Sequence, residues 1–219
     1  MPHLWHHRSK QPIHTACAGG FFSIMTVVEE KRALRERLVR ARAALPPDEH
    51  DTRSGAAARV LASLPAWQRA RTVALYAPLG AEVDTALAAE LASIAGKRLA
   101  WPRLRPDMLA LEFATCAPAD LVAGPLRALE PPAGAPRVPI EDVDLLVVPG
   151  VGFDATGHRL GRGRGHYDAT LALAPRGTLR VGLSFELQLV PEVPCEPHDA
   201  RLDLVVTEER VLAEGAARR

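Results

Sequence analysis

A segment rich in glycine and arginine carries the residue types best suited to bind phosphate. It follows an apolar run at 145–148, which is predicted to be a buried strand, and it precedes a helix expected to begin at Ala169. Arginines alternate with glycines in the order Gly161, Arg162, Gly163, Arg164 and Gly165. Backbone N–H groups at a glycine-rich turn and at a helix N-terminus attract anions, and guanidinium groups match phosphate oxygens. The segment is therefore predicted to be a phosphate-binding loop.

The spacing within this loop matches neither of the two common nucleotide-binding motifs, G-x-x-x-x-G-K-[ST] and G-x-G-x-x-G. A Gly/Arg tract alone would favour a flexible basic turn at the surface. The preceding strand, the following helix and Asp168 at the end of the loop favour the functional interpretation. A carboxylate at this position suits the Mg²⁺ that accompanies a nucleoside triphosphate.

Two further positions could take part in such a site. Lys31 and Arg35 lie one helical turn apart beside the apolar stripe of the first predicted helix. Solvated surface cations are the commonest explanation of such a pair, and a phosphate clamp is the alternative; their spacing is compatible with both. Glu82 follows a predicted strand at 72–77, the position at which open α/β sheets bind ligands.

The composition is that of an ordinary globular domain. The 219 residues are 47% hydrophobic and 24% charged, with a formal net charge of +1. This charge gives no reason to expect a nucleic acid or an anionic membrane as a partner, and no apolar run approaches the roughly 20 residues of a spanning helix. Cys17, Cys116 and Cys195 match neither a disulfide framework nor a zinc pattern, so a reducing, cytoplasmic setting is expected.

Residues 1–25 differ from the rest because they hold four of the eight histidines and no acidic residue. A targeting peptide, a metal-binding histidine tract and a mis-assigned start are the competing interpretations. The apolar core of a secretory signal is absent, and the histidines have no accompanying cysteine or carboxylate. Because a helix start follows Met25 at once, a mis-assigned start or a disordered leader is expected.

A single α/β domain is expected at 26–210, with a tail at 211–219. Thr26 and Glu29 form a capping box at the start of a helix that Pro46-Pro47 ends. Further helices are expected at 48–64 and from Asp84 or Thr85, as N-cap, to about 94. Strands are expected at 72–77, 98–101, 109–114, 141–149, 179–184 and 202–207. This alternation indicates a mostly parallel sheet covered on both faces, whereas the Pro-, Gly- and Ala-rich stretch 117–135 is predicted to be a surface segment without chemistry.

Four segments, taken together and in order, resemble the 5-formyltetrahydrofolate cyclo-ligase family, also called methenyltetrahydrofolate synthetases. The most specific is the Gly/Arg loop with its flanks, DLLVVPGVGFDATGHRLGRGRGHYDATL. The other three are KRALRERL, LYAPLGAEVDT and VGLSFELQLVPEVPCEPHDARLDLVVTE. The resemblance covers roughly residues 31–208. It implies a three-layer α/β/α fold with a mostly parallel, Rossmann-like central sheet.

The resemblance also implies a reaction and its site. The reaction is the ATP- and Mg²⁺-dependent conversion of 5-formyltetrahydrofolate to 5,10-methenyltetrahydrofolate with release of ADP and phosphate, by a protein expected to be a monomer. Nucleotide contacts fall on Lys31, Arg35, Arg159, Leu160, Gly161, Arg162, Gly163, Arg164, Gly165, His166 and Tyr167. Folate contacts fall on Glu82, Tyr76, Arg162 and His166. Metal-associated acids fall on Asp168 and Asp199, and Asp203 ranks lower because a charge beside a last strand is usually only solvated.

In the implied mechanism the γ-phosphoryl group is transferred to the formyl oxygen, N10 attacks the formyl carbon, and phosphate departs. Arg162 is the residue predicted to lie nearest the transferred phosphoryl group. The family usually carries tyrosine where this chain has His166, which keeps a flat ring but is titratable near neutral pH. This departure leaves open a protein that binds folate or nucleotide without turnover. A sugar-phosphate enzyme on a related scaffold, which would not consume ATP, is the third alternative.

Overall fold

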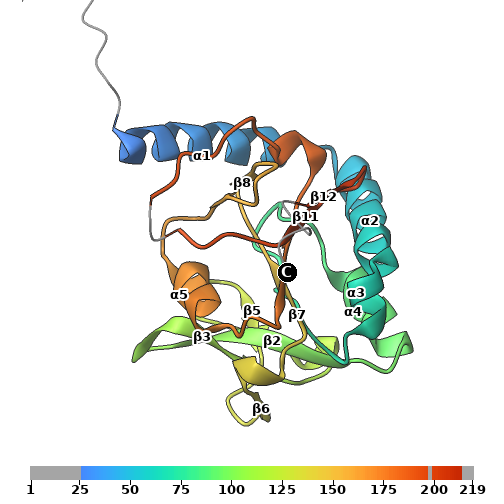
Figure 1. Cartoon of the computed structure of the whole chain (residues 1–219). Helices are drawn as coiled ribbons and strands as arrows, with labels where there is room; N and C mark the ends of the chain where they lie inside the picture. The colour runs from blue at the N-terminus through green and yellow to red at the C-terminus, as the bar shows by residue number, and fades with distance from the viewer. Residues whose placement is uncertain (1–25, 197–198, 214–219) are drawn as a thin grey trace, which may run out of the picture.

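An eight-stranded sheet forms the centre of the described chain, with the strand order β12-β11-β10-β7-β1-β2-β3-β6. The structure is a computed structural model, and it describes residues 26–196 and 199–213 (Figure 1). The leader expected at 1–25 lies outside the described residues. The sheet strands are β1 (Thr72–Ala74), β2 (Arg98–Arg105), β3 (Met108–Ala114), β6 (Arg137–Val138), β7 (Leu145–Val148), β10 (Leu179–Leu183), β11 (Leu204–Val206) and β12 (Val211–Ala213).

The middle of the sheet is parallel, as the sequence predicts. The pairings β2–β1, β1–β7, β7–β10 and β10–β11 are parallel, and the pairings β2–β3, β3–β6 and β11–β12 at the two sides are antiparallel. All four residues of β7 and all three of β1 are buried, because helices cover both faces of these strands. The sheet continues through β12, so the expected boundary at 210 falls inside its last hairpin.

Helices form a layer on each face of the sheet, which gives the expected three-layer α/β/α arrangement (Figure 1). On one face, α2 (Pro47–Ser63), α3 (Pro65–Arg69) and α4 (Ala86–Ile94) pack on Val73, Leu145 and other core residues. On the other face, α5 (His166–Leu173) packs Leu171 against the opposite sides of the same strands. The short 3₁₀ helices of the described chain are η1 (Pro118–Asp120), η2 (Ile140–Asp142) and η3 (Glu186–Gln188).

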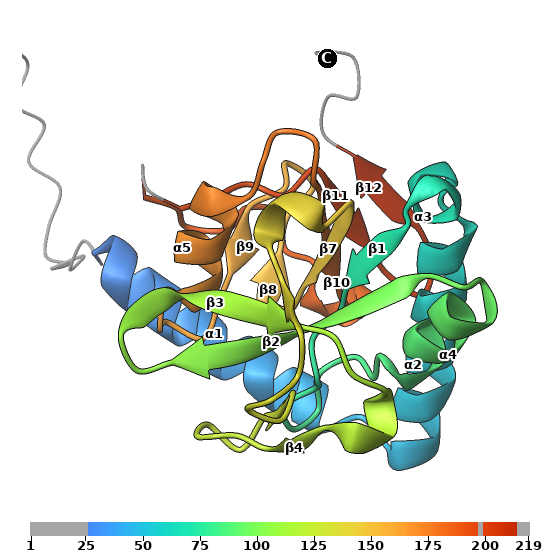
Figure 2. The ribbon, with the colours of Figure 1, turned by 90° about the horizontal axis from the view of Figure 1, so that it is seen from below.

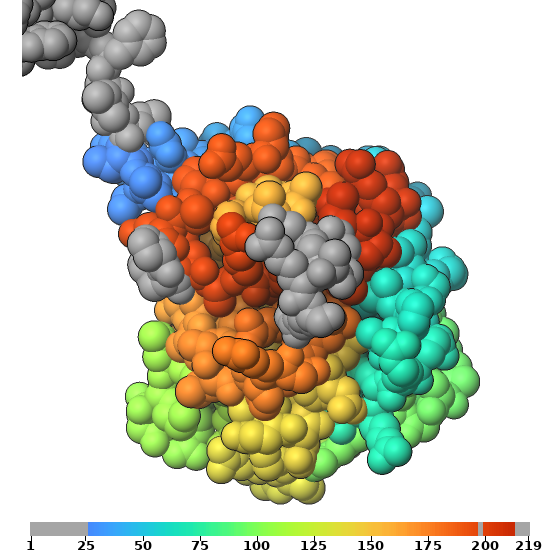
Figure 3. Space-filling model, viewed as in Figure 1, coloured from blue at the N-terminus to red at the C-terminus, as the bar shows by residue number. Residues whose placement is uncertain are grey.

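Helix α1 (Val27–Ala43) lies across the carboxyl end of the central strands (Figure 1). The predicted capping box is present: the Thr26 hydroxyl accepts from the Glu29 N–H at 3.3 Å, and the Glu29 carboxylate accepts from the Thr26 N–H at 2.8 Å. Leu38 anchors the helix in a small cluster with Val151 and Leu160. In the space-filling view α1 lies beside the η3 segment, and the last strands lie beside α2 (Figure 3).

Three local expectations differ from the structure. Helix α5 begins at His166 rather than Ala169. Gly165, with a φ of 72°, lies directly before the helix, and residues 166–168 include no proline or glycine that would prevent them from being helical. A hairpin, β8 (Gly152–Phe153) with β9 (Arg159–Leu160), stands between β7 and the loop. The stretch 117–135 is not merely a surface segment: it forms the hairpin β4 (Val122–Ala123) with β5 (Leu129–Glu130), which contacts β2.

Strands β2 and β3 form a long two-stranded ribbon that reaches α5 (Figure 2). The ribbon and the β4–β5 hairpin border the carboxyl end of the sheet beside the Gly/Arg loop. No helix in the described part of the chain combines the length and the apolar character that a membrane span requires.

Candidate active site

A pocket of about 240 Å³ opens at the carboxyl ends of β1 and β7. The chain leaves β1 toward β2 on one side, and it leaves β7 toward β10 on the other, so the strand order reverses between these two neighbours. Ligands of open α/β sheets bind at such a switch point. The pocket is lined by Tyr76, Leu79 and Glu82 after β1, by Pro149 and Gly150 after β7, and by the loop residues from Gly161 to Asp168.

The Gly/Arg loop has the backbone freedom and the helix start that an anion site requires. Gly163 and Gly165 adopt φ values of 88° and 72°, which side chains disfavour, and α5 begins directly afterwards. Arg35 of α1 supports the loop from outside the pocket lining, donating from Nε to the Gly161 carbonyl at 2.9 Å. The structure therefore brings Arg35 to the loop backbone, as a phosphate clamp or a loop support would require.

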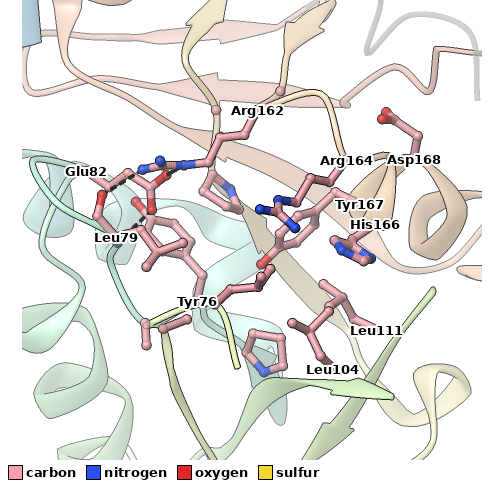
Figure 4. A pocket seen from close by; sticks show the side chains of 18 of the residues that line it. Tyr76, Leu79, Glu82, Leu104, Leu111, Arg162, Arg164, His166, Tyr167 and Asp168 are labelled. Carbon is pink, nitrogen blue, oxygen red and sulfur yellow. Dashed lines mark hydrogen bonds and ion pairs between the residues drawn. The ribbon is translucent and has the colours of Figure 1, made fainter. Parts of the chain in front are cut away.

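Glu82 is a buried carboxylate with both oxygens in use; the residue is 4% exposed. Its Oε1 accepts from Arg162 Nε at 2.9 Å, and its Oε2 accepts from the Leu79 N–H at 2.9 Å (Figure 4). Tyr76, beneath it, donates its hydroxyl proton to the Val83 carbonyl at 3.0 Å. Burial, with the negative charge of Glu82 nearby, raises the pKa of Tyr76 well above its ordinary value. Tyr76 is thus a neutral hydrogen-bonding wall of the pocket.

Arg159 supports the loop from below. Its side chain is 4% exposed and donates to Asp168 Oδ1 at 2.8 Å and to the Pro149 carbonyl at 3.3 Å. Its guanidinium lies over the Tyr167 ring at 5.8 Å, and its Nε is a buried donor with no hydrogen-bond partner among the described residues. A Cβ added at Gly161 would lie 2.7 Å from Arg159 Nη1, so a larger residue there would require the guanidinium to shift.

The second titratable ring of the pocket belongs to Tyr167, at the start of α5. Burial, with a contribution from Glu82, raises the pKa of Tyr167, while the charge of Arg159 opposes the rise. Beside it, His166 Nδ1 lies 2.8 Å from the Leu109 carbonyl, so the ring ties the start of α5 to the tip of the β2–β3 ribbon.

Lys31 and Asp199 lie together but outside the pocket lining. Lys31 Nζ pairs with Asp199 Oδ2 at 2.6 Å and with Glu196 Oε2 at 2.7 Å. Burial lowers the pKa of Lys31, but the hydrogen bonds and charges of Asp199 and Glu196 outweigh it and hold that pKa above its ordinary value. Asp203 accepts from the Arg180 N–H at 2.8 Å between β10 and β11, which is a structural position.

Asp168 and Asp199, the two carboxylates expected to bind the metal, have different partners. Asp168 pairs with Arg159, and Asp199 pairs with Lys31. Within the described ranges no group of three or more His, Cys, Asp and Glu side chains is arranged to hold a metal ion. Mg²⁺ is commonly held by one or two carboxylates together with substrate phosphates, and a single carboxylate such as Asp168, at the end of the Gly/Arg loop, is compatible with that mode. The described residues therefore do not form a metal site built from protein ligands alone.

The sequence does not predict the side of the pocket that strands β2, β3 and β5 form. Leu104 and Leu111 of the β2–β3 ribbon (Figure 4) and Leu129 of β5 form its apolar side, and Glu130 of β5 also lines it. The segment that holds β5 has no regular apolar period, so the sequence carries no signal that places it beside the loop.

Arg42, buried at the end of α1, donates to the Gly150 carbonyl at 3.0 Å, and burial lowers its pKa.

Replacement of Glu130 by glutamine is expected to raise the melting temperature by about 1–4 °C at pH 7. Glu130 is 6% exposed, and burial raises its pKa despite the Leu104 N–H and Arg103, which lower it. A carboxyl whose pKa is raised on folding stabilises the fold below its unfolded pKa, and this contribution is lost as the pH rises through the folded pKa. The gain should therefore grow from pH 4 to pH 7 in thermal melts. Exposed Glu141→Gln is the control, and an equal gain there would contradict the assignment to burial.

The comparisons with known proteins agree on one family. The sequence model of the 5-formyltetrahydrofolate cyclo-ligase family matches residues 27–208. A 5-formyltetrahydrofolate cyclo-ligase of Escherichia coli K12 is 36% identical over 176 residues, which span 78% of this chain and 96% of the relative. A protein of the same name from Mycolicibacterium smegmatis is 34% identical over 145 residues, which span 64% of this chain and 75% of the relative.

Solved structures agree with the sequence comparisons. The NMR structure of the 5,10-methenyltetrahydrofolate synthetase of Aquifex aeolicus superposes with a TM-score of 0.76 at 32% identity, covering 86% of this chain and 95% of that one. A 5,10-methenyltetrahydrofolate synthetase from Mycoplasma pneumoniae superposes with a TM-score of 0.68 at 25% identity, covering 82% and 99%. The sequence match, the shared fold and the pocket at the switch point together establish that the chain belongs to the 5-formyltetrahydrofolate cyclo-ligase family.

Proposed function

We propose that this protein converts 5-formyltetrahydrofolate to 5,10-methenyltetrahydrofolate, consuming ATP with Mg²⁺ and releasing ADP and phosphate. One observation carries the proposal: a buried carboxylate, Glu82, and a Gly/Arg loop at a helix N-terminus line the same pocket. The carboxylate suits the amino-pyrimidine edge of a pterin, and the loop suits a polyphosphate. The relatives are named 5-formyltetrahydrofolate cyclo-ligases, which supports the folate cyclisation.

The folate fits the side of the pocket formed by β1, β2 and β5. Glu82 accepts hydrogen bonds from the pterin edge, and Tyr76 closes the pocket behind it. Leu104, Leu111 and Leu129 offer an apolar surface against which flat rings pack. His166, held by the Leu109 carbonyl, presents its ring at the edge of this surface.

The nucleotide fits the loop side. Arg162, Arg164 and the N–H groups at the start of α5 face the pocket, and the unpaired Nε of buried Arg159 is a further donor beneath the loop. Lys31 and Arg35 would reach phosphate oxygens from α1, with Lys31 exchanging its present carboxylate partners. Asp168 and Asp199 would hold Mg²⁺, which would offset the negative charge of the phosphates.

The proposed reaction consists of two displacement steps. The formyl oxygen attacks the γ-phosphorus, and the bond to the bridging oxygen breaks to release ADP. The N10 lone pair then attacks the formyl carbon, N10 loses its proton, and the C–O bond breaks to release phosphate. In phosphoryl transfer the protein mainly positions the partners and neutralises developing charge, and Arg162 would do this for the transferred group.

A spectrophotometric assay tests the proposal. Absorbance of the methenyl product should rise when 5-formyltetrahydrofolate, ATP and Mg²⁺ are all present, with one ADP formed per product. Omission of ATP, or addition of a chelator, should stop the rise. Folate binding without product would identify a binding protein instead, and product without ADP would exclude an ATP-driven reaction.

A further inference from the structure

The side chain of Arg162 crosses the pocket from the Gly/Arg loop to the segment that follows β1 (Figure 4). Its Nε donates to Glu82 Oε1 at 2.9 Å, and its Nη2 donates to the Leu79 carbonyl at 2.7 Å. A carboxylate oxygen and a backbone carbonyl oxygen therefore lie side by side, bridged by one planar group with two N–H donors.

The carboxylate acceptor is buried and has further contacts, whereas the side chain of the donor is half-exposed. Glu82 is buried, its second oxygen accepts from the Leu79 N–H, and its own carbonyl lies 3.0 Å from His50 Nε2. The Arg162 side chain is 46% exposed and stands between two glycines, of which Gly163 has a φ of 88°. Rotation of Arg162 away from the pair would leave the hydrogen bond between the Leu79 N–H and Glu82 Oε2 in place.

The donor pattern of a guanidinium is that of an amino-pyrimidine edge. In both groups two N–H bonds on adjacent nitrogens of one N–C–N unit point in the same direction within a plane. We infer that the Leu79 carbonyl and the Glu82 carboxylate together form the receptor for the pterin edge, and that Arg162 is an internal substitute which the incoming folate displaces. This inference rests on the proposed function and adds Leu79 as a specificity-determining residue.

Displacement has a consequence for the nucleotide. A guanidinium that donates to Glu82 and Leu79 cannot bind a phosphate with the same N–H groups. Arg162 can therefore bind a phosphate at the loop only when the folate has taken over its two acceptors. Folate should then strengthen nucleotide binding, and by linkage the nucleotide should strengthen folate binding by the same factor, on the order of fivefold or more.

Direct titration of 5-formyltetrahydrofolate without ATP tests the inference. Arg162→Ala removes the internal competitor, so it should bind this folate about threefold or more tightly than the wild type. Arg164→Ala is the matched control, because it removes the same charge from the same loop but not the contact with Glu82. Glu82→Gln should weaken binding, and a folate analogue without the 2-amino group should lose the preference for Arg162→Ala over the wild type.

Added methylguanidine gives a second readout. It should compete with the folate in Arg162→Ala, where the acceptor pair is open, and compete far less in the wild type. Weaker folate binding by Arg162→Ala, comparable to that of Glu82→Gln, would overturn the inference, because Arg162 would then contact the folate itself, as the family resemblance implies. If the wild type forms product while this pattern is absent, only the inference fails. If the wild type binds the folate in this pattern without forming product, the proposed function fails and the receptor stands.

Discussion

Arg162→Ala is expected to lower turnover by roughly 100-fold or more, the loss typical of a removed contact to the charge that develops in a transition state. Arg162 stands between Gly161 and Gly163 and lines the pocket. In the proposed mechanism its guanidinium contacts the transferred phosphoryl group from the loop. Removal of an interaction made only in the transition state lowers kcat without raising KM. The measurement is steady-state formation of the methenyl product with saturating ATP and Mg²⁺.

Arg162→Lys is the informative companion variant. A lysine retains a positive charge but not the planar pair of donors, so it should recover part of the turnover that alanine loses. Turnover by Arg162→Ala within about threefold of the wild type would remove Arg162 from the proposed mechanism, whereas the receptor of Glu82 and Leu79 would be judged separately by folate titration.

Asp168→Ala is expected to lower the free energy of unfolding by about 3 kcal/mol, in addition to any loss of activity. Asp168 is the carboxylate partner of Arg159, whose side chain is 4% exposed and already has one unpaired donor. Without Asp168 the buried cation would retain only the Pro149 carbonyl as a hydrogen-bond acceptor in the described chain. Urea unfolding of the wild type and the variant measures the difference.

A double-mutant cycle separates this support from a role in holding Mg²⁺. Arg159→Met removes the buried cation, so Asp168→Ala should cost little stability in that background. A role with the metal would appear instead as a shift of the Mg²⁺ concentration needed for half-maximal activity of Asp168→Asn. A stability loss below about 0.5 kcal/mol for Asp168→Ala in the wild-type background would show that Arg159 does not depend on this carboxylate.

The elements that depend on near neighbours in the chain follow from the sequence. The capping box at Thr26 needs only a partner three residues away, and the apolar run at 145–148 is long enough for a buried strand. The Gly/Arg loop before a helix is likewise a local pattern, as are the alternating elements that predict a mostly parallel sheet. Even there the pattern misplaces the start of α5, because the N-cap residue Gly165 has no capping side chain that would mark the boundary in the sequence.

Contacts between distant segments were decided only by the tertiary structure. Glu82 and Arg162 are 80 residues apart, and they meet because β1 and β7 are neighbours at the point where the strand order reverses. The same topology sets Leu129 and Glu130 beside the loop, although their segment has no apolar period. It also pairs Lys31 with Asp199 outside the pocket that holds Glu82. Residue types and spacing determine local conformation and available chemistry, whereas strand order determines which side chains share a cavity, and periodicity along the chain carries no information about that order.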